Sequence, residues 1–479
     1  MVDSNHQQIK VVSECFIKPK YEVEASKQPH YLAPDDLIFL PLDHMQKGLL
    51  FLGKPQNIQS HLLDKLKISL SQSLVHFYPL AGQLATQKFH DEHAIWVYVD
   101  CTTGPGARLI HAVVNTNSTV SDLLSFTDIH PIVPCLFDLG EKAVNHDGHT
   151  RPLLSIQVTE LLDGVFIGFT MNHSVADGTS LWHFISTLSE IFLELKDENH
   201  SNNVTNNEAT KFQSDLSNNI VVSRKPIFCK PLLPEGYGPI IKLPYLEPDE
   251  FVSRFDPGVL RERIFHISSK AMSMLKAKAN EECENINDHN VISSFQALSA
   301  FIWISITRVR NLEPSLMTIC PFPLNWRARI TPPLSQECFG NYVEGLQCAS
   351  KVGDLLGHGL GSAALLIQRS VEALDDSKIR QRLCSYVKAP FLAKTGSTYY
   401  EPNGVLLGGS AKFDMYGPEF GLGKAVAVLA GYSNKADGKV TVNPGREGGG
   451  SVDLEICLKP ETMNALESDE EFMSFVSVN

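Results

Sequence analysis

Residues 164–178 read GVFIGFTMNHSVADG, and this stretch sets the interpretation of the chain. Its first eight residues are apolar and β-prone, which predicts a buried strand over 164–171. His173 follows shortly after, so an imidazole, which titrates near neutral pH, stands where that strand ends. After Gly178 the pattern turns helical, with Thr179 or Ser180 as the expected cap. We therefore expect His173 to reach a cleft at a strand–helix junction.

The remaining periodicity predicts a mixture of strands and helices. Leucines recur every four residues from Leu62 to Leu74 and predict an amphipathic helix over 58–75. Further strands are expected over 95–99, 109–113 and 153–161, and later over 426–430, 440–442 and 452–458. Helices are expected over 270–280 and 291–310. Because strands and helices do not alternate regularly, the expected fold class is α/β with mixed (α+β) sheets rather than a parallel βαβ array.

A chain of 479 residues is long enough for two domains of roughly 200 residues each. Asn, Ser, Thr and Asp dominate residues 198–219, where apolar periodicity is lost. We expect an N-terminal domain over 1–197, a flexible crossover linker over 198–225, and a C-terminal domain over 226–479.

Composition excludes several classes of partner. The 41 basic and 54 acidic residues give a net charge of −13, which argues against nucleic acid as the partner. No apolar run approaches the ~20 residues of a membrane span, so we expect a cytoplasmic protein. We also expect a monomer. Ten scattered cysteines without a C-x-x-C pair predict reduced thiols and no metal site.

Three further stretches accompany the histidine motif. They read LVHFYPLAG over 74–82, NWRARITPPL over 325–334 followed by FGN over 339–341, and YGPEFGLGK over 416–424. Together with H-x-x-x-D-G at 173–178, they resemble the BAHD acyl-CoA-dependent acyltransferases of plants, from about residue 11 to 475. The resemblance implies two similar domains of the coenzyme-A-dependent acyltransferase type joined by a crossover loop. It also implies acyl transfer from acyl-CoA, a cosubstrate rather than a bound cofactor, to an alcohol or amine of a plant specialised metabolite.

The second signature of that family is D-F-G-W-G, which here reads E-F-G-L-G over 419–423. Glu419 keeps the carboxylate, so we expect the family's structural ion pair to form with Arg327 or Arg329. Gly421 and Gly423 are expected to shape the same loop. Leu422 keeps bulk but lacks the indole N–H of the family's tryptophan, so this chain represents a branch with a modified motif.

The resemblance makes His173 the general base. An alcohol or amine that attacks a thioester must lose its proton, and an imidazole accepts it at neutral pH, which typically gives ~10²–10⁴-fold in rate. Asp177 would sit beside His173 on a helix and could orient its ring, but the resemblance implies a structural role through an arginine. Gly178 is expected where a Cβ would be forbidden.

Other positions carry weaker assignments. An oxyanion needs a hydrogen-bond donor, for which the candidates are the hydroxyls of Ser410 and Tyr416, a backbone N–H of the 421–423 turn, or a water. The 416–424 loop could equally be a structural clasp. By resemblance, coenzyme A would be held by Ser269, Lys276, Lys278 and Ser294.

The sequence is also compatible with two rival functions. A lyase of the same fold could use His173 on a bound acyl donor without an acceptor, and Leu422 and Glu419 keep that reading open. A non-catalytic binding protein is disfavoured because His173, Asp177 and Gly178 are all present. No nucleophile motif calls for a covalent acyl-enzyme.

Overall fold

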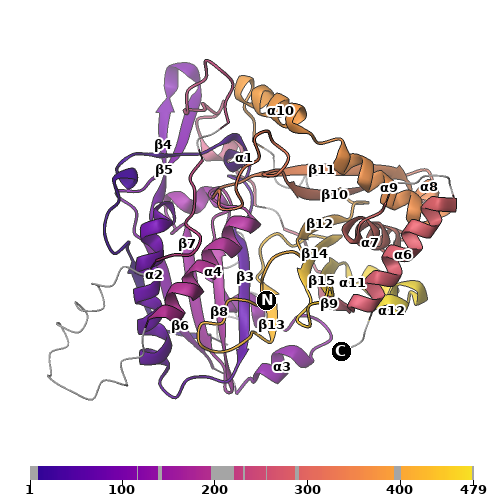
Figure 1. Cartoon of the computed structure of the whole chain (residues 1–479), viewed down its shortest axis with the longest axis horizontal. Helices are drawn as coiled ribbons and strands as arrows, with labels where there is room; N and C mark the ends of the chain where they lie inside the picture. Colours follow the sequence, from indigo (N-terminus) through magenta and orange to yellow (C-terminus); the bar gives the residue numbers. More distant parts are fainter. Residues whose placement is uncertain are drawn as a thin grey trace.

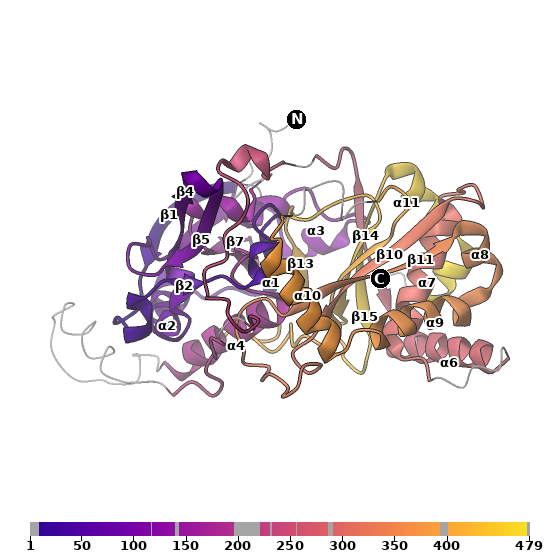
Figure 2. The same ribbon diagram turned by 90° about the horizontal axis from the view of Figure 1, so that it is seen from above.

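The computed structural model describes residues 9–115, 117–138, 143–195, 221–229, 232–254, 256–285, 291–392 and 401–476. Residues 198–220 of the expected linker lie outside this set. The chain forms two packed units that lie side by side, with the N-terminal half in one and most of the C-terminal half in the other (Figure 2). The fold class is α/β with several mixed sheets, as the sequence predicts.

A six-stranded sheet is the centre of the first unit. Its strands, in spatial order, are β1 (Ile9–Ile17), β6 (Ala107–Val114), β7 (Leu154–Glu160), β8 (Gly164–Met171), β3 (Met45–Leu52) and β13 (Ala427–Ala430). All neighbours pair antiparallel except β6 and β7, which are parallel. Every residue of β8 is buried, because this strand lies inside the sheet between β7 and β3.

Two helices, α2 (Asp64–His76) and α4 (Gly178–Glu194), cover one face of this sheet (Figure 1). The four leucines that predict the helix over 58–75 are fully buried in the core beneath it. Burying an apolar side chain of this size contributes roughly 1.5–3 kcal/mol each before entropy is counted. The periodic leucines therefore fix the helix against the sheet that carries His173. The short helices α1 (Pro34–Leu37) and α3 (Val120–Ser125) belong to the same unit.

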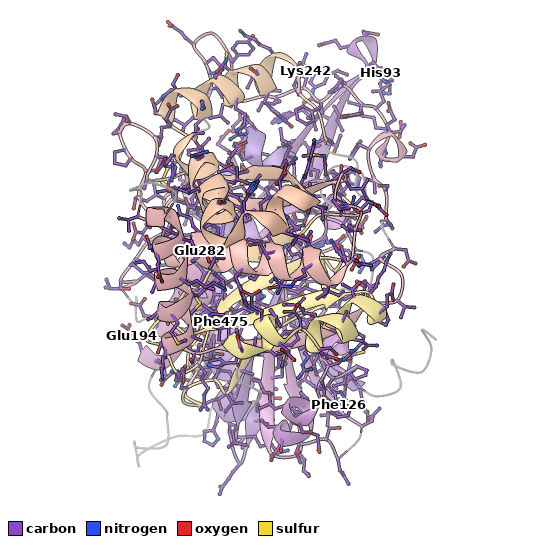
Figure 3. The ribbon with its side chains drawn as sticks, turned by 90° about the vertical axis from the view of Figure 1, so that its right-hand side faces the viewer. His93, Phe126, Glu194, Lys242, Glu282 and Phe475 are labelled. Atoms are coloured by element: carbon purple, nitrogen blue, oxygen red, sulfur yellow. A yellow bond between two sulfur atoms is a disulfide. The ribbon has the colours of Figure 1, made fainter. Side chains whose placement is uncertain are left out.

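The first unit also contains a three-stranded sheet, which contacts residues from the second half of the sequence. This sheet consists of β2 (His30–Tyr31), β5 (Ala94–Asp100) and β4 (Gln83–Phe89). Leu243 pairs with Ile95 by two backbone hydrogen bonds, and Lys242 forms an ion pair with Glu92. Figure 3 shows Lys242 and His93 at the same end of the molecule. Residues 241–251 thus pack on the N-terminal core.

The second unit contains a four-stranded and a two-stranded sheet. The first has the order β12 (Leu406–Gly409), β14 (Lys439–Pro444), β15 (Val452–Leu458) and β9 (Arg261–Ile267), and the second pairs β10 (Met317–Asn325) with β11 (Val343–Lys351). The helices of this unit are α6 (Ser269–Asn285), α7 (Ser294–Val309), α8 (Val352–Gly357), α9 (Gly359–Glu372), α10 (Asp376–Lys388), α11 (Pro460–Glu467) and α12 (Glu470–Phe475).

Strand β13 lies apart from the other two late strands. It does not join β14 and β15 but pairs with β3 at the edge of the first sheet, where Leu429 faces Gly48. The packing units therefore do not divide cleanly at the expected linker, because residues 241–251 and 427–430 both pack on the first unit. Polar contacts also cross between the units: Arg261 binds Asp128 at 2.7 Å.

Cys229 and Cys338 form a disulfide, which contradicts the expectation that all ten thiols are reduced. A backbone bridge next to these residues brings them together: Ile227 donates to the carbonyl of Glu337 and accepts from Phe339. The two cysteines are 109 residues apart, so their spacing gave no sign of pairing. Within the described ranges, no helix has both the length and the apolar character needed to cross a membrane.

Candidate active site

His173 lies directly beyond β8, where the chain turns before α4. Its backbone N–H donates to Oδ1 of Asn145 at 2.7 Å, and its carbonyl accepts from Nδ2 of Asn341 at 2.7 Å. The ring of Phe39 stacks on the imidazole with centroids 4.0 Å apart and an interplanar angle of 6°. The backbone and the ring plane of His173 are therefore fixed by three neighbours.

The surroundings of the ring keep it neutral. Burial lowers the pKa of His173, while its own carbonyl, the Asp177 charge, the Ala176 carbonyl and the Asn341 side chain oppose that shift. Nδ1 is buried and makes no hydrogen bond of ordinary geometry within the described part of the chain. A neutral imidazole has one nitrogen free to accept a proton, which is the property that a general base requires.

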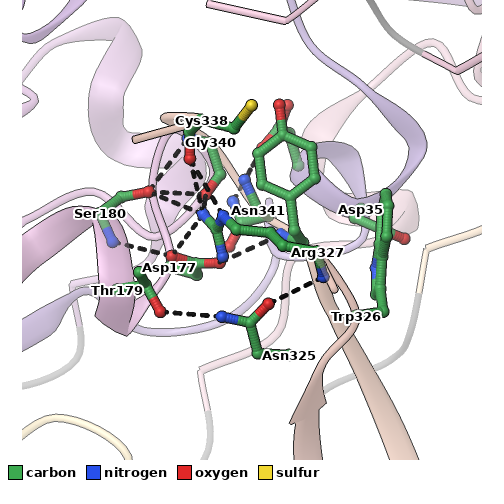
Figure 4. Close-up of polar contacts among 12 residues, drawn as sticks. Asp35, Asp177, Thr179, Ser180, Asn325, Trp326, Arg327, Cys338, Gly340 and Asn341 are labelled. Atoms are coloured by element: carbon green, nitrogen blue, oxygen red, sulfur yellow. Dashed lines mark hydrogen bonds and ion pairs between the residues drawn. The ribbon is translucent and has the colours of Figure 1, made fainter. Parts of the chain in front are cut away.

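Asp177 is the N-cap of α4 and the partner of a buried arginine (Figure 4). Oδ1 accepts from the backbone N–H of Ser180 at 2.9 Å and from Nη2 of Arg327 at 3.1 Å. Oδ2 accepts from Nη1 of Arg327 at 2.6 Å and from the backbone N–H of Tyr342 at 3.1 Å. Both oxygens are thus occupied by groups other than the imidazole. The helix begins at Gly178, so residues 173–177 do not place Asp177 one helical turn from His173, and Asp177 takes the place of Thr179 or Ser180 as the cap.

Arg327 is fully buried, with 0% of its side chain exposed. Besides Asp177, its guanidinium donates to the carbonyls of Cys338 and Gly340 and lies over the ring of Tyr342 at 4.4 Å. A buried charge is tolerated when it is paired and its hydrogen bonds are satisfied. Arg327 therefore joins the histidine turn to the chain over 338–342.

Gly178 touches an aromatic ring from a distant segment. A Cβ at this position would lie 2.9 Å from the Phe413 ring, closer than side-chain carbons pack. This close approach explains why residue 178 is a glycine, as expected for a position where a Cβ would be forbidden. It also brings the turn over 410–413 against the histidine motif.

The expected ion pair of Glu419 is wrong. Glu419 is exposed, the guanidinium of Arg327 is occupied by Asp177, and Arg329 donates to the carbonyls of Val371 and Leu374. The resemblance implied Arg327 or Arg329 as the partner of Glu419, and both guanidinium groups bind other residues. The buried N-cap aspartate is the one that pairs with Arg327.

The 416–424 loop is held by its backbone rather than by Glu419. The N–H groups of Glu419 and Phe420 donate to Oγ of Ser189 on α4 at 3.1 and 3.3 Å. Phe420, Gly421 and Gly423 all have positive φ, at 48°, 69° and 76°. Glycine adopts such angles at little cost, which explains two of these positions. Leu422 is half-buried against the core of the first unit.

The two hydroxyl candidates for an oxyanion donor lie in different surroundings. Burial and the Asp453 carboxylate raise the pKa of the Tyr416 hydroxyl, and the backbone N–H of Val428 opposes that shift. Ser410 begins the turn that ends at Phe413, whose N–H donates to the Ser410 carbonyl. Since Phe413 contacts Gly178, Ser410 is the candidate whose turn touches the histidine motif.

An open cavity of about 380 Å³ lies on the second unit, between the start of α6, the start of α7 and the loop before β15. Three of the four residues assigned to coenzyme A line it: Ser269, Lys276 and Ser294. Lys278 does not, because its amino group binds Glu471 at 2.8 Å on another side of α6. The cavity is also lined by Met272, Ser273, Ala277, Asn280, Gly449 and Gly450.

Sequence reasoning missed the residues that position His173. Phe39 and Asn145 stand in stretches without a catalytic pattern, far from residue 173 in the sequence. Asn341 ends the quoted FGN segment, but nothing in that segment assigned it a role. The chain must fold before these side chains converge.

A model of the Transferase family matches residues 7–473. An Arabidopsis thaliana protein named as an acetyltransferase is 34% identical over 464 residues, which cover 96% of this chain and 98% of that protein. The protein named BAHD acyltransferase DCR, also from Arabidopsis thaliana, is 30% identical, with 97% and 92% of the two chains covered.

Two solved structures share the fold. Vinorine synthase gives a TM-score of 0.64 at 19% identity, covering 98% of this chain and 99% of that one. The TRI101 protein of F. sporotrichioides, solved with coenzyme A and T-2, gives 0.71 at 19% identity, covering 94% and 99%. Fold and relatives define an acyltransferase of the coenzyme-A-dependent, two-domain class. More narrowly, the chain belongs to the BAHD acyltransferase family.

Proposed function

We propose that this acyltransferase moves an acyl group from acyl-CoA to a hydroxyl or amine with His173 as general base. The observation that carries the proposal is the setting of His173: it follows a buried strand, its backbone and ring are fixed, and burial favours the neutral imidazole. Asp177, the nearest acidic motif residue, is committed to Arg327. The role of His173 is thus independent of an aspartate dyad.

The reaction follows from that arrangement. The free imidazole nitrogen takes the proton of the acceptor O–H or N–H while the acceptor atom attacks the thioester carbonyl. The resulting tetrahedral intermediate collapses, the C–S bond breaks, and the imidazolium returns the proton to the leaving thiolate. The products are the ester or amide and free coenzyme A. A donor near the developing oxyanion would accelerate the step, and Ser410 is the candidate on the turn beside Gly178.

Coenzyme A is assigned to the 380 Å³ cavity on the second unit. Its lining offers the Lys276 ammonium, the Ser269 and Ser294 hydroxyls, and the starts of α6 and α7, because the N-terminus of a helix favours anions. Solved relatives of this fold include complexes with coenzyme A. We also propose a cytoplasmic monomer.

Purified enzyme incubated with acetyl-, malonyl-, benzoyl- and hydroxycinnamoyl-CoA and a panel of plant alcohols and amines tests the proposal. Those acyl classes follow the names of relatives that match this chain. We expect thiol release that depends on the acceptor, together with an acylated product seen by mass spectrometry. A product formed without any acceptor would favour the lyase, and no turnover with any pair would favour a binding protein.

A further inference from the structure

The loop over 445–450 forms one wall of the cavity assigned to coenzyme A. Gly449 and Gly450 line that cavity, and a Cβ at Gly449 would lie 3.7 Å from the Cβ of Ser269, another lining residue. Gly448, Gly449 and Gly450 have φ angles of 73°, 64° and 92°. Glycine loses more backbone freedom on ordering than any other residue, so three in succession are costly to hold in one conformation. The position of this wall therefore depends on the contacts that hold the loop from outside.

His266 connects the loop to the four-stranded sheet. It lies near the end of β9, and its side chain is 14% exposed. Nδ1 of its ring lies 2.6 Å from Oδ1 of Asp453 on β15, and Nε2 lies 3.2 Å from Oε1 of Glu447 in the loop. An ionised carboxylate only accepts hydrogen bonds, and an imidazole donates from both nitrogens only when it is protonated. The imidazolium is therefore the form of His266 that makes both contacts.

A second contact holds the loop from the side of the first unit. Nζ of Lys424, the last residue of the 416–424 loop, donates to the carbonyl of Arg446 at 2.7 Å. The same ammonium lies 5.4 Å from the centre of the Tyr416 ring. The 445–450 loop is thus held between β9 and the 416–424 loop, and the contact with β9 is made by an imidazole, which titrates near neutral pH.

The charged neighbours of His266 favour its imidazolium. Burial lowers the pKa of His266, but the hydrogen bonds and charges of Asp453 and Glu447 outweigh burial and raise that pKa above its usual value. The cluster also includes the Tyr416 hydroxyl, whose pKa burial and the Asp453 charge raise, and the Arg446 guanidinium. Because the folded pKa of His266 is raised, the ion pair with Glu447 is present below that pKa and is lost as the pH rises through it.

We propose that His266 is a positioning residue for acyl-CoA: its imidazolium holds Glu447, and with it the 445–450 wall, in the conformation that binds coenzyme A. The affinity for coenzyme A then falls as the pH rises through the titration of His266. This inference rests on the proposed coenzyme A cavity and does not depend on the role of His173.

Calorimetric titration with coenzyme A between about pH 6 and about pH 9 tests the proposal. Glu447→Gln should raise Kd by about 2-fold to 5-fold at the acidic end, the size of a partly exposed ion pair. Its side chain is 55% exposed, so the variant should fold like the parent. At the alkaline end the two proteins should converge, because the parent has then lost the imidazolium. His266→Gln should behave like Glu447→Gln, and the double variant should bind no more weakly than either single variant.

His111→Gln is the matched control. His111 on β6 pairs with Glu160 on β7 at 2.8 Å, which is also a histidine–carboxylate contact between neighbouring strands, but in the first unit. This variant should leave Kd and its pH dependence unchanged. In turnover assays at the acidic end, Glu447→Gln should raise KM for acyl-CoA by the same factor as Kd and leave kcat unchanged, because the wall of the cavity moves and the base does not.

Equal Kd values for Glu447→Gln and the parent over the whole pH range would overturn the proposal. Lys276→Ala separates this failure from failure of the cavity assignment. If Lys276→Ala weakens binding and Glu447→Gln does not, the positioning role of His266 is wrong. If neither variant weakens binding, the cavity assignment is wrong and the positioning role falls with it. Binding is measured without turnover, so the result stands apart from the proposed role of His173, which fails if His173→Ala stays active.

Discussion

Replacing Asp177 by Asn tests whether its charge holds the active-site turn together. Asp177 and Arg327 are 1% and 0% exposed, so the substitution leaves a guanidinium in the core with no counter-charge. Removing one partner of a buried pair costs about 3–5 kcal/mol. The Asn oxygen can still cap the N–H of Ser180, so loss of the cap adds little. We expect the free energy of unfolding to fall by about 3–5 kcal/mol.

Urea denaturation of the parent and of Asp177→Asn measures that change. Asp375→Asn is the matched control, because Asp375 caps α10 at the N–H of Lys378 but is exposed. It should alter stability by no more than about 0.5 kcal/mol. Adding Arg327→Met to Asp177→Asn should recover part of the loss, since the unpaired charge is then removed. A folded Asp177→Asn enzyme as stable as the parent but as inactive as His173→Ala would refute the structural role and indicate a catalytic dyad.

Three further changes probe the loop and the cavity. Leu422→Trp should cost ~1–3 kcal/mol in thermal denaturation without raising turnover, because Leu422 packs against the core; higher turnover at an unchanged melting temperature would contradict this. Glu419→Gln and Arg327→Gln should be additive within about 0.5 kcal/mol, since the two side chains do not pair, and a larger coupling would restore the ion pair. Lys276→Ala should raise KM for acyl-CoA several-fold while Lys278→Ala should not, and equal effects would argue against the cavity.

Local patterns were sufficient to predict the elements around His173. The apolar run over 164–171 forms β8, and the leucines over 58–75 form a helical segment that consists of a first turn over Gln59–Leu63 and of α2. The helix expected over 291–310 forms as α7, which begins at Ser294 and is capped by Ser293. These features depend on periodicity and caps, which neighbouring residues determine.

Side-chain partners were less predictable because they depend on packing between distant segments. Lys276 and Lys278 are two residues apart on α6, so they point to different sides, and only the fold shows which side bears the cavity. From the sequence, Arg327 could pair with Asp177 or with Glu419. In the structure it pairs with Asp177, and both side chains are buried.

The sequence also did not predict which strand β13 pairs with. The four residues of β13 carry β propensity but no information about which sheet has an open edge. The Cys229–Cys338 disulfide also depends on contacts between distant segments, because the backbone bridge at Ile227 brings the two cysteines together.

The proposed mechanism requires His173 to remove the acceptor proton. The most direct measurement compares parent and His173→Ala in acceptor-dependent thiol release from acyl-CoA, with coenzyme A affinity and melting temperature measured on the same samples. The account predicts a loss of turnover of at least ~10²-fold with affinity and stability nearly unchanged. Near-parental turnover by the purified, folded variant would contradict it.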